Sequence, residues 1–417
     1  MMPPSVSPVD LKKLLSTSSQ YLDYCEARIR FLLQRKQTFA EFPGVQTGYN
    51  SITGAEFAAS DLLSYSWING RGACVFARFS RFFPHLAGDL HAYAAAVIET
   101  LEQHYRDNGN SFPFLVDLDG REKAVGQPKP KGYKSYSDLY VGMGFLEFGA
   151  TFGDRNRTQT AREIFQQTVQ ALRENRFVTE PDLTPADRVL ENPFSVALDL
   201  ANEFAKQLHD PAYLDVGAEL TAYLLDRYYR ADRDAFVEYV TPAGAPFVDE
   251  HGRETADPGH AIEFCSFALE FSRLSEKEGR HEALRQRVNE IAPRVIRWNL
   301  DHGWNRTHPG IYKTVDAKSL KPINETMPWW ILPETILAVL LAYERTGDSA
   351  FLDAYRKAHD TYFSTYMNPR TRWGPFQNID GRTGAPVDIV PACKFQDPEF
   401  HSGKNLLIAS EILRRLP

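Results

Sequence analysis

A repeat of helical segments with a period near 65 residues constrains this chain more than any other feature of its sequence. Breaks that contain Gly or Asp stand at residues 87–89, 152–154, 208–210, 278–280 and 346–348, at spacings of 65, 56, 70 and 68 residues. Between them, apolar residues recur at i, i+3, i+4 and i+7, as Ile336, Leu340 and Tyr343 do, which is the pattern of an amphipathic helix. Such a period predicts repeated supersecondary units.

Each unit is predicted to hold two helices. The first helices begin near Arg71, Tyr136, Asn192, Gly259, Trp330 and His401, at intervals of 65, 56, 67, 71 and 71 residues. They carry few charges, whereas a second helix such as that at 349–367 has a charged face. Because a helix that is apolar nearly all round must be buried on several sides, we expect an all-α (α/α)6 barrel of inner and outer helices rather than an open solenoid. Gly347 and Asp348 are expected to end one helix and cap the next.

The segments between the helices predict where a ligand binds. No low-complexity linker divides the chain, so we expect a single catalytic domain over 1–417, with 1–20 as a loosely docked N-terminal segment. Longer segments near 106–135, 238–258, 302–328 and 367–400 lead into the starts of inner helices. A polar pocket is therefore expected at the mouth where these loops gather and the helix N-termini carry partial positive charge.

Composition limits the partners. The 47 Lys and Arg residues against 54 Asp and Glu leave a net charge of −7, which offers no attraction to nucleic acid or to an anionic membrane surface. No charged and apolar leader and no run of eighteen uncharged apolar residues is present, so we expect a soluble, cytoplasmic protein. Cys25, Cys74, Cys265 and Cys393 lie at least 49 residues apart, which excludes a CxxC pair, and a disulfide scaffold is not expected in a chain of this size.

Two histidines open predicted inner helices. His260 follows a Pro-Gly pair, and His401 precedes the last apolar segment. An imidazole titrates near neutral pH and so suits reversible proton transfer. Two imidazoles at equivalent places in different hairpins could face one substrate from opposite sides, although each could instead cap its helix.

Several charged residues accompany the histidines. Glu263 shares a helical face with His260, and the two could be metal ligands; no similar cluster recurs, so Glu263 is better interpreted as orienting the imidazole or binding a hydroxyl. Glu334 begins an apolar helix and needs a cationic or hydroxyl partner, unless the helix dipole alone stabilises it. Arg71 and Arg78 lie in an apolar segment, where each requires a carboxylate or an oxygen-rich ligand.

Further candidates for ligand binding are Tyr136, Asn192 and Trp330, at the starts of three inner helices. No GxGxxG, GxxxxGK[ST], GxSxG or HExxH motif occurs, which argues against nucleotide cofactors, phosphoryl transfer, serine hydrolysis and zincin chemistry. We therefore expect neither a cofactor nor a metal.

From about Tyr65 to Leu413 the chain resembles the N-acylglucosamine 2-epimerase superfamily, which also holds cellobiose 2-epimerases and mannose-type aldose-ketose isomerases on an (α/α)6 barrel. The resemblance lies in GRGACVFARF, YVGMGFLEFG, PGHAIEF, WWILPE and the late WGPF…EFHSGKN segment. It implies an acid/base pair formed by His260 and His401, with sugar hydroxyls contacted by Arg71, Glu263, Trp330 and Glu334.

The implied reaction inverts C2 of an open-chain sugar, because one base removes the proton and the other returns it on the opposite face of an enediol. A lone base would instead make a ketose. Val196 stands where cellobiose epimerases and several isomerases place a histidine, which favours N-acylglucosamine and N-acylmannosamine as the substrate pair. Thr326 to Pro328 and Ser402-Gly403, however, differ from the residues that N-acylglucosamine epimerases have at these places. The related free aldoses and aldose-ketose isomerisation therefore stay open.

Two other classes also stay open from the residues alone. One is a glycoside hydrolase that uses Glu263 and Glu334, and the other is a non-enzymatic helical-repeat binding protein. The expected partner is a small sugar, with neither nucleic acid nor membrane. A homodimer is compatible with this interpretation, and the sequence leaves the oligomeric state open.

Overall fold

The computed structural model describes residues 8–416 except for 43, 59–61, 118–120, 124–128, 181–182, 372–373 and 389–396, and it describes only the backbone of 8–15. Twelve α-helices lie within this part of the chain. The inner ring consists of α2 (Ser66–Phe82), α4 (Tyr136–Phe152), α6 (Asn192–Leu208), α8 (Pro258–Lys277), α10 (Ile331–Thr346) and α12 (Ser402–Arg415). The outer ring consists of α1 (Pro8–Thr38), α3 (Ala87–Asp107), α5 (Arg155–Arg173), α7 (Ala212–Arg227), α9 (Glu282–Gly303) and α11 (Ala350–Thr361).

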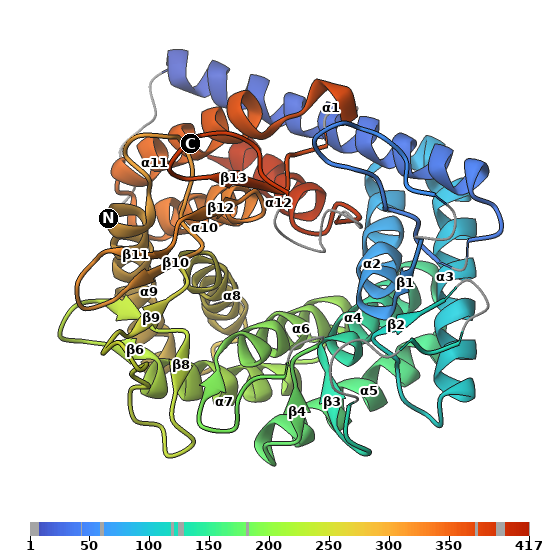
Figure 1. Ribbon diagram of the computed structural model, residues 1–417, viewed down its shortest axis with the longest axis horizontal. Helices are drawn as coiled ribbons and strands as arrows, with labels where there is room; N and C mark the ends of the chain where they lie inside the picture. The colour runs from blue at the N-terminus through green and yellow to red at the C-terminus, as the bar shows by residue number, and fades with distance from the viewer. Residues whose placement is uncertain are drawn as a thin grey trace.

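The helices alternate between the two rings along the chain (Figure 1). Consecutive inner helices contact one another from α2 to α12, and each inner helix makes its most extensive outer-ring contact with one outer helix. The ring closes where α12 meets α2, since a Cβ atom on Gly403 would lie 2.7 Å from the ring of Phe79. The (α/α)6 barrel predicted from the repeat is confirmed, and the open solenoid is excluded.

Burial follows the predicted division of the helices. Every residue of α4 from Ser137 to Gly149 is buried, as is every residue of α10 from Ile331 to Tyr343. Small residues let the inner helices approach closely, because a Cβ atom on Gly70 would lie 2.5 Å from the backbone of Tyr140 in α4. Hydrophobic packing between the inner helices therefore forms the core.

The predicted helix break at Gly347 has the expected geometry. This residue ends α10 with a φ of +70°, in the left-handed region that glycine adopts without steric cost. The side chain of Asp348 then accepts a hydrogen bond from the backbone N–H of Ala350, at the start of α11. Asp348 thus satisfies a backbone N–H at the start of α11 immediately after the break at Gly347.

The outer partner of α12 comes from the other end of the chain. Residues 8–20, expected to be loosely docked, form the first part of α1, while residues 1–7 lie outside the described part of the chain. Ser18 and Tyr21 are buried, and Oγ of Ser18 donates to the carbonyl oxygen of Ser410 at 3.1 Å. The repeat analysis missed this pairing because here the outer helix precedes its inner partner by almost the whole chain.

Short strands lie in the loops at one mouth of the barrel. Strands stand directly before five of the inner helices: β1 (Ser64–Tyr65), β3 (Lys134–Ser135), β5 (Val189–Leu190), β9 (Thr255–Ala256) and β12 (Thr326–Pro328). The others are β2 (Leu115–Val116), β4 (Phe177–Val178), β6 (Tyr229–Arg230), β7 (Ala235–Phe236), β8 (Tyr239–Val240), β10 (Thr314–Asp316), β11 (Pro322–Asn324) and β13 (Asn378–Asp380). The pairs are β1–β2, β3–β4, β5–β8, β6–β7 and β12–β13, and β11–β10–β9 is a three-stranded sheet; only β3–β4 is parallel.

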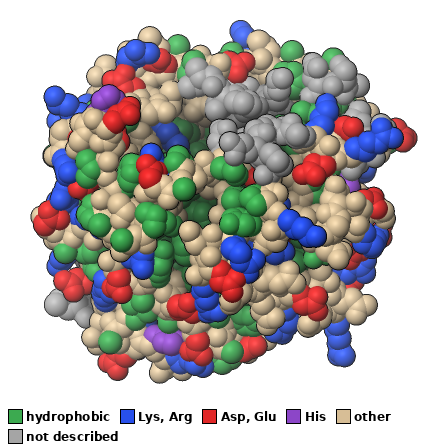
Figure 2. All heavy atoms as spheres, turned by 60° about the horizontal axis from the view of Figure 1, so that its bottom comes forward, with side chains coloured by type: hydrophobic (Ala, Val, Ile, Leu, Met, Phe, Trp, Pro, Cys, Tyr) green, Lys and Arg blue, Asp and Glu red, His purple; other side chains and the backbone are tan. Residues whose placement is uncertain are grey.

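The surface carries both signs of charge. Figure 2 shows Lys, Arg, Asp and Glu side chains interspersed on one face, with hydrophobic side chains around a hollow near its centre. Within the described residues, no helix is both long and apolar enough to span a bilayer. Cys25, Cys74 and Cys265 are buried and free, and Cys393 lies outside the described residues.

Candidate active site

A cavity of about 320 Å³ lies at the mouth that bears the strands. Its walls include Arg71, Tyr136, Asn192, His260, Glu263, Trp330 and His401, all predicted from the sequence to act on a sugar. The remaining predicted residue, Glu334, lies behind His401 and contacts it. The sequence did not single out the other lining residues as ligand contacts: Trp67, Ile68, Tyr140, Lys313, Trp329, Gln377 and Asp397.

His401 is held from two sides directly before α12. Its Nδ1 lies 2.7 Å from Oε1 of Glu334, and its backbone N–H donates to the carboxylate of Asp397 at 2.9 Å. Burial and the nearby charge of Arg71 lower the pKa of His401 to about 4. The imidazole is therefore neutral at neutral pH and can accept a proton.

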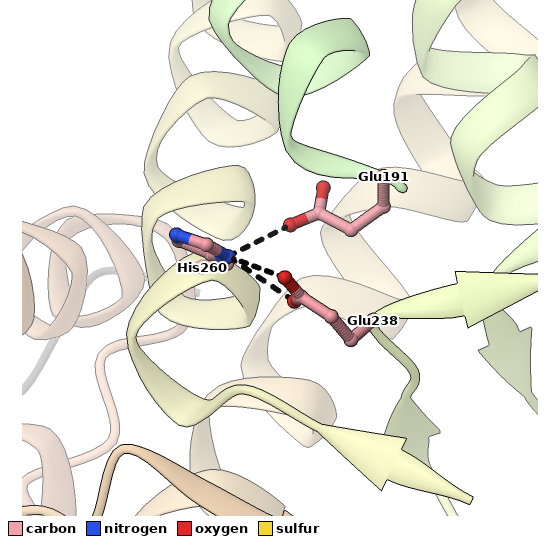
Figure 3. Close-up of side chains that lie close together, drawn as sticks. All are labelled: Glu191, Glu238 and His260. Atoms are coloured by element: carbon pink, nitrogen blue, oxygen red, sulfur yellow. Dashed lines mark hydrogen bonds and ion pairs between the residues drawn. The ribbon is translucent and has the colours of Figure 1, made fainter. Parts of the chain in front are cut away.

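His260 occupies the first turn of α8, whose N-terminus is capped by the Asp257 carboxylate. Its Nδ1 lies 2.9 and 3.1 Å from the two carboxylate oxygens of Glu238, as Figure 3 shows. Burial alone would lower the pKa of His260, but the charges of Asp257 and Glu238 outweigh it and raise the pKa to about 9. This imidazole is therefore charged at neutral pH and can donate a proton.

Trp330 places the two imidazoles relative to each other. Its ring centroid lies 5.4 Å from that of His260 and 5.4 Å from that of His401. Gly259 makes this packing possible, because a Cβ atom there would lie 2.5 Å from the indole ring. The two imidazoles thus flank one indole and line one cavity, close enough to reach the same small molecule.

A hydrogen-bonded chain crosses the cavity wall from α4 to α8. The hydroxyl of Tyr136 donates to Oδ1 of Asn192 at 2.9 Å, and Nδ2 of Asn192 donates to Glu263 at 3.0 Å. Burial and the neighbouring carboxylate of Glu334 raise the pKa of Glu263 to about 7. Burial likewise raises the pKa of Glu334 to about 7.

Possible metal-ligand atoms fall into two clusters within the described residues. Glu263 groups with Glu334 and His401, while His260 groups with Glu191 and Glu238, with all ligand atoms of a cluster within 4.8 Å of one another. The metal hypothesis required His260 and Glu263 to bind the same ion. Because their ligand atoms fall in different clusters, the two residues do not form one ligand pair.

Arg71 lies among aromatic rings at the cavity wall. Its guanidinium carbon is 4.0 Å from the ring centroid of Tyr140 and 5.0 Å from that of Trp67. The nearest described carboxylate oxygen, on Asp397, is 3.7 Å away, and the buried Nε makes no hydrogen bond. The Arg71 side chain lines the cavity, so its guanidinium lies where it can contact a ligand oxygen.

Arg78, two turns further along α2, has a structural role instead. It donates to Glu147 in α4 at 2.6 Å and to Glu203 in α6 at 2.7 Å, and all three side chains are buried. One buried guanidinium thus bridges two carboxylates between three inner helices, away from the cavity that holds Arg71.

Three charged residues of the site come from segments without a recognised motif. Asp257 had a usable signal, since an Asp before Pro-Gly is typical of a helix start. Lys313 precedes β10 and forms an ion pair with Asp257. Glu238 lies between two short strands, where the sequence offered no reason to single it out.

Known proteins that are similar to this chain identify its family. The fold and the site define an α/α barrel with a polar cavity at its loop-bearing mouth. Residues 57–396 match the N-acylglucosamine 2-epimerase (GlcNAc 2-epimerase) family, to which the chain therefore belongs. The N-acylglucosamine 2-epimerase of Bos taurus is 24% identical over 386 residues, which cover 89% of this chain and 86% of that protein. This membership confirms the resemblance and the assignment to the carbohydrate epimerases.

Solved structures establish the fold independently. The cellobiose 2-epimerase from Spirochaeta thermophila DSM 6192 superposes with a TM-score of 0.74 at 16% identity, covering 98% of this chain and 99% of the other. A D-mannose isomerase superposes with a TM-score of 0.67 at 11% identity, covering 97% and 98% of the two chains.

Proposed function

We propose that this protein inverts C2 of an open-chain aldose, with N-acylglucosamine and N-acylmannosamine as the substrate pair. The observation that carries the proposal is the placement of a neutral imidazole, His401, and a positively charged one, His260, on one cavity with the Trp330 ring 5.4 Å from each. The name of the bovine relative supports the choice of the N-acyl sugars.

The mechanism begins with proton abstraction by the neutral base. Because Nδ1 of His401 is hydrogen-bonded to Glu334, Nε2 is the ring nitrogen that takes the C2 proton. The electron pair of the broken C–H bond moves onto the carbonyl oxygen and gives an enediolate. Arg71, which lines the cavity, stabilises the developing oxyanion, a role in which one preorganised donor contributes about 3–4 kcal/mol.

The second imidazole completes the inversion. His260 donates a proton from Nε2 to C2 on the opposite face of the enediolate, the carbonyl reforms, and the configuration at C2 is reversed. After product release His401 loses the proton that it took to solvent and His260 regains one from solvent, which restores the starting charges. The reverse reaction begins from the other protonation state, with neutral His260 as base and protonated His401 as acid. A single base that returned the proton to C1 would give a ketose, so the presence of two imidazoles favours epimerisation over aldose-ketose isomerisation.

A glycoside hydrolase is disfavoured by the carboxylates. One oxygen of Glu263 and one of Glu334 lie within 4.8 Å of each other, well short of the separation of about 6.5–9.5 Å that inverting hydrolysis needs. Glu334 is engaged with His401 and, unlike Glu263, does not line the cavity, so the two glutamates do not face one glycosidic bond.

The direct test is proton exchange with solvent. The protein is incubated in deuterium oxide with N-acetylglucosamine, N-acetylmannosamine, glucose and mannose in turn, and C2–H loss and epimer formation are followed by NMR. We expect exchange at C2 together with interconversion of the N-acetyl pair. Absence of C2 exchange for all four sugars would overturn the proposal, and ketose formation would favour the isomerase.

A further inference from the structure

We propose that Glu238 is a positioning residue for His260. Its carboxylate accepts a hydrogen bond from Nδ1–H of the imidazole, which keeps that proton on Nδ1 and turns Nε2 toward the cavity. The inference rests on the proposed function, in which His260 exchanges a proton with C2 of the sugar. Glu238 does not line the cavity and belongs to no recognised motif. Figure 3 shows both of its carboxylate oxygens on the Nδ1 side of the ring, with the other ring nitrogen pointing away from them.

The carboxylate of Glu238 is held on a fixed backbone. The residue stands between β7 and β8, and it is buried. Its backbone N–H donates to the carbonyl of Thr255 at 2.8 Å, and its carbonyl accepts from the N–H of Glu191 at 3.1 Å. Thr255 belongs to β9, directly before α8, so these bonds tie Glu238 to the segment that leads into the helix of His260.

Other charged groups also face His260, but each differs from Glu238. An oxygen of Asp257 is 3.5 Å from Nδ1, and its carboxylate already accepts from Lys313 and from the N–H of Gly259. Glu263 follows His260 by three residues on α8 and accepts instead from Asn192. Among the described residues, Glu238 therefore supplies the carboxylate nearest to Nδ1.

Glu191 provides an internal comparison. Its Oε1 lies 3.9 Å from Nδ1 of His260, beyond hydrogen-bonding distance, and Ser195 donates to its other oxygen. Burial and the charge of Glu238 raise the pKa of Glu191 well above its ordinary value. Two glutamates thus flank the same imidazole, and only one forms a hydrogen bond with it.

The proton balance defines what Glu238 contributes. The Nδ1–H bond stays intact throughout the cycle, while the N–H bond at Nε2 breaks as C2 gains its proton and forms again when solvent returns a proton after product release. An acceptor at Nδ1 enforces this division between the two ring nitrogens. A glutamine there could donate to Nδ1 instead, which would favour the wrong tautomer and remove the negative charge that stabilises the imidazolium.

The test compares Glu238→Gln with the matched variant Glu191→Gln, which makes the same chemical change beside the same ring. We expect Glu238→Gln to lower kcat by about a hundredfold or more, since orienting carboxylates of catalytic histidines have effects of that order. KM is expected to stay within about threefold, and the alkaline limb of the pH profile is expected to move to lower pH. Glu191→Gln is expected to change kcat by less than about threefold, and Glu238→Asp, which keeps the charge, is expected to recover part of the rate.

Two outcomes would overturn the inference: an unchanged rate and pH profile in Glu238→Gln, or an equal loss in Glu191→Gln. Thermal unfolding of each variant separates a loss of folding from a loss of positioning. NMR titration of labelled His260 gives a readout independent of turnover, and a lower pKa in Glu238→Gln is expected. If the wild-type protein exchanges C2–H in no sugar, the proposed function fails, while this titration still decides whether Glu238 controls His260.

Discussion

Oε1 of Glu334 lies 2.7 Å from Nδ1 of His401, and both side chains are buried. The same contact recurs across the cavity between Glu238 and His260. The two imidazoles nevertheless differ in charge, because Arg71 approaches His401 whereas Asp257 approaches His260. Environments that separate the pKa values of two titratable groups assign one as base and the other as acid.

Replacing either histidine tests this assignment. His260→Asn and His401→Asn are each expected to lower kcat at least about a hundredfold, because each removes a group that transfers the proton. His251→Asn, an exposed histidine, serves as the control and should retain the wild-type rate. Turnover is measured by NMR with the N-acetyl sugars, and near-wild-type rates in both site variants would assign the histidines to helix capping.

The pH dependence of turnover follows from the two shifted groups. Proton abstraction requires neutral His401, which is present above its pKa of about 4. Proton donation requires charged His260, which is present below its pKa of about 9. We therefore expect kcat/KM to fall at pH values below the first pKa and above the second. Retention of the full rate well below pH 4 or well above pH 9 would contradict the assignment of a neutral and a charged imidazole.

Substitution of Arg71 tests the role in stabilising the oxyanion. Arg71→Met is expected to lower kcat by about a hundredfold to a thousandfold, the range found when one oxyanion donor is removed. Arg71→Lys keeps the charge but changes the donor geometry, so an intermediate rate is expected. Steady-state kinetics measures both variants, and a rise in KM without a change in kcat would limit Arg71 to substrate binding.

Two glycine substitutions test the close packing of the barrel. Gly70→Ala would place a Cβ atom 2.5 Å from the backbone of Tyr140, so α2 and α4 would have to separate. The expected loss of unfolding free energy is about 1–3 kcal/mol, as for other overpacked cores. Gly88→Ala in α3 meets nothing within 4 Å and should leave stability unchanged or raise it by up to about 1 kcal/mol. Denaturant unfolding compares them, and equal effects would refute this account.

The regular part of the fold could be predicted because periodicity and burial are linked. The interval between helix starts predicted the pairs, and the near absence of charge in segments such as 331–343 predicted the inner ring. Motif residues at the starts of inner helices, including Arg71 and His260, were located for the same reason, since a barrel brings these starts together at one mouth.

The supporting residues could not be predicted because they depend on contacts between distant loops. Glu238 reaches His260 through pairing of short irregular strands, and Lys313 reaches Asp257 across 56 residues of sequence. Arg71 and Arg78 lie in the same apolar segment and cannot be told apart from the sequence. The structure distinguishes them, because Glu147 and Glu203 on neighbouring helices form ion pairs with Arg78 and not with Arg71.

The seam between α1 and α12 has a consequence for biosynthesis. The bond from Ser18 to Ser410 joins residues separated by 392 positions, so α1 leaves the ribosome long before α12, the helix against which it docks, has been made. His401 stands directly before α12. A product that ends before residue 401 would therefore lack both the element that closes the barrel and the proposed base, and we expect it to show no turnover.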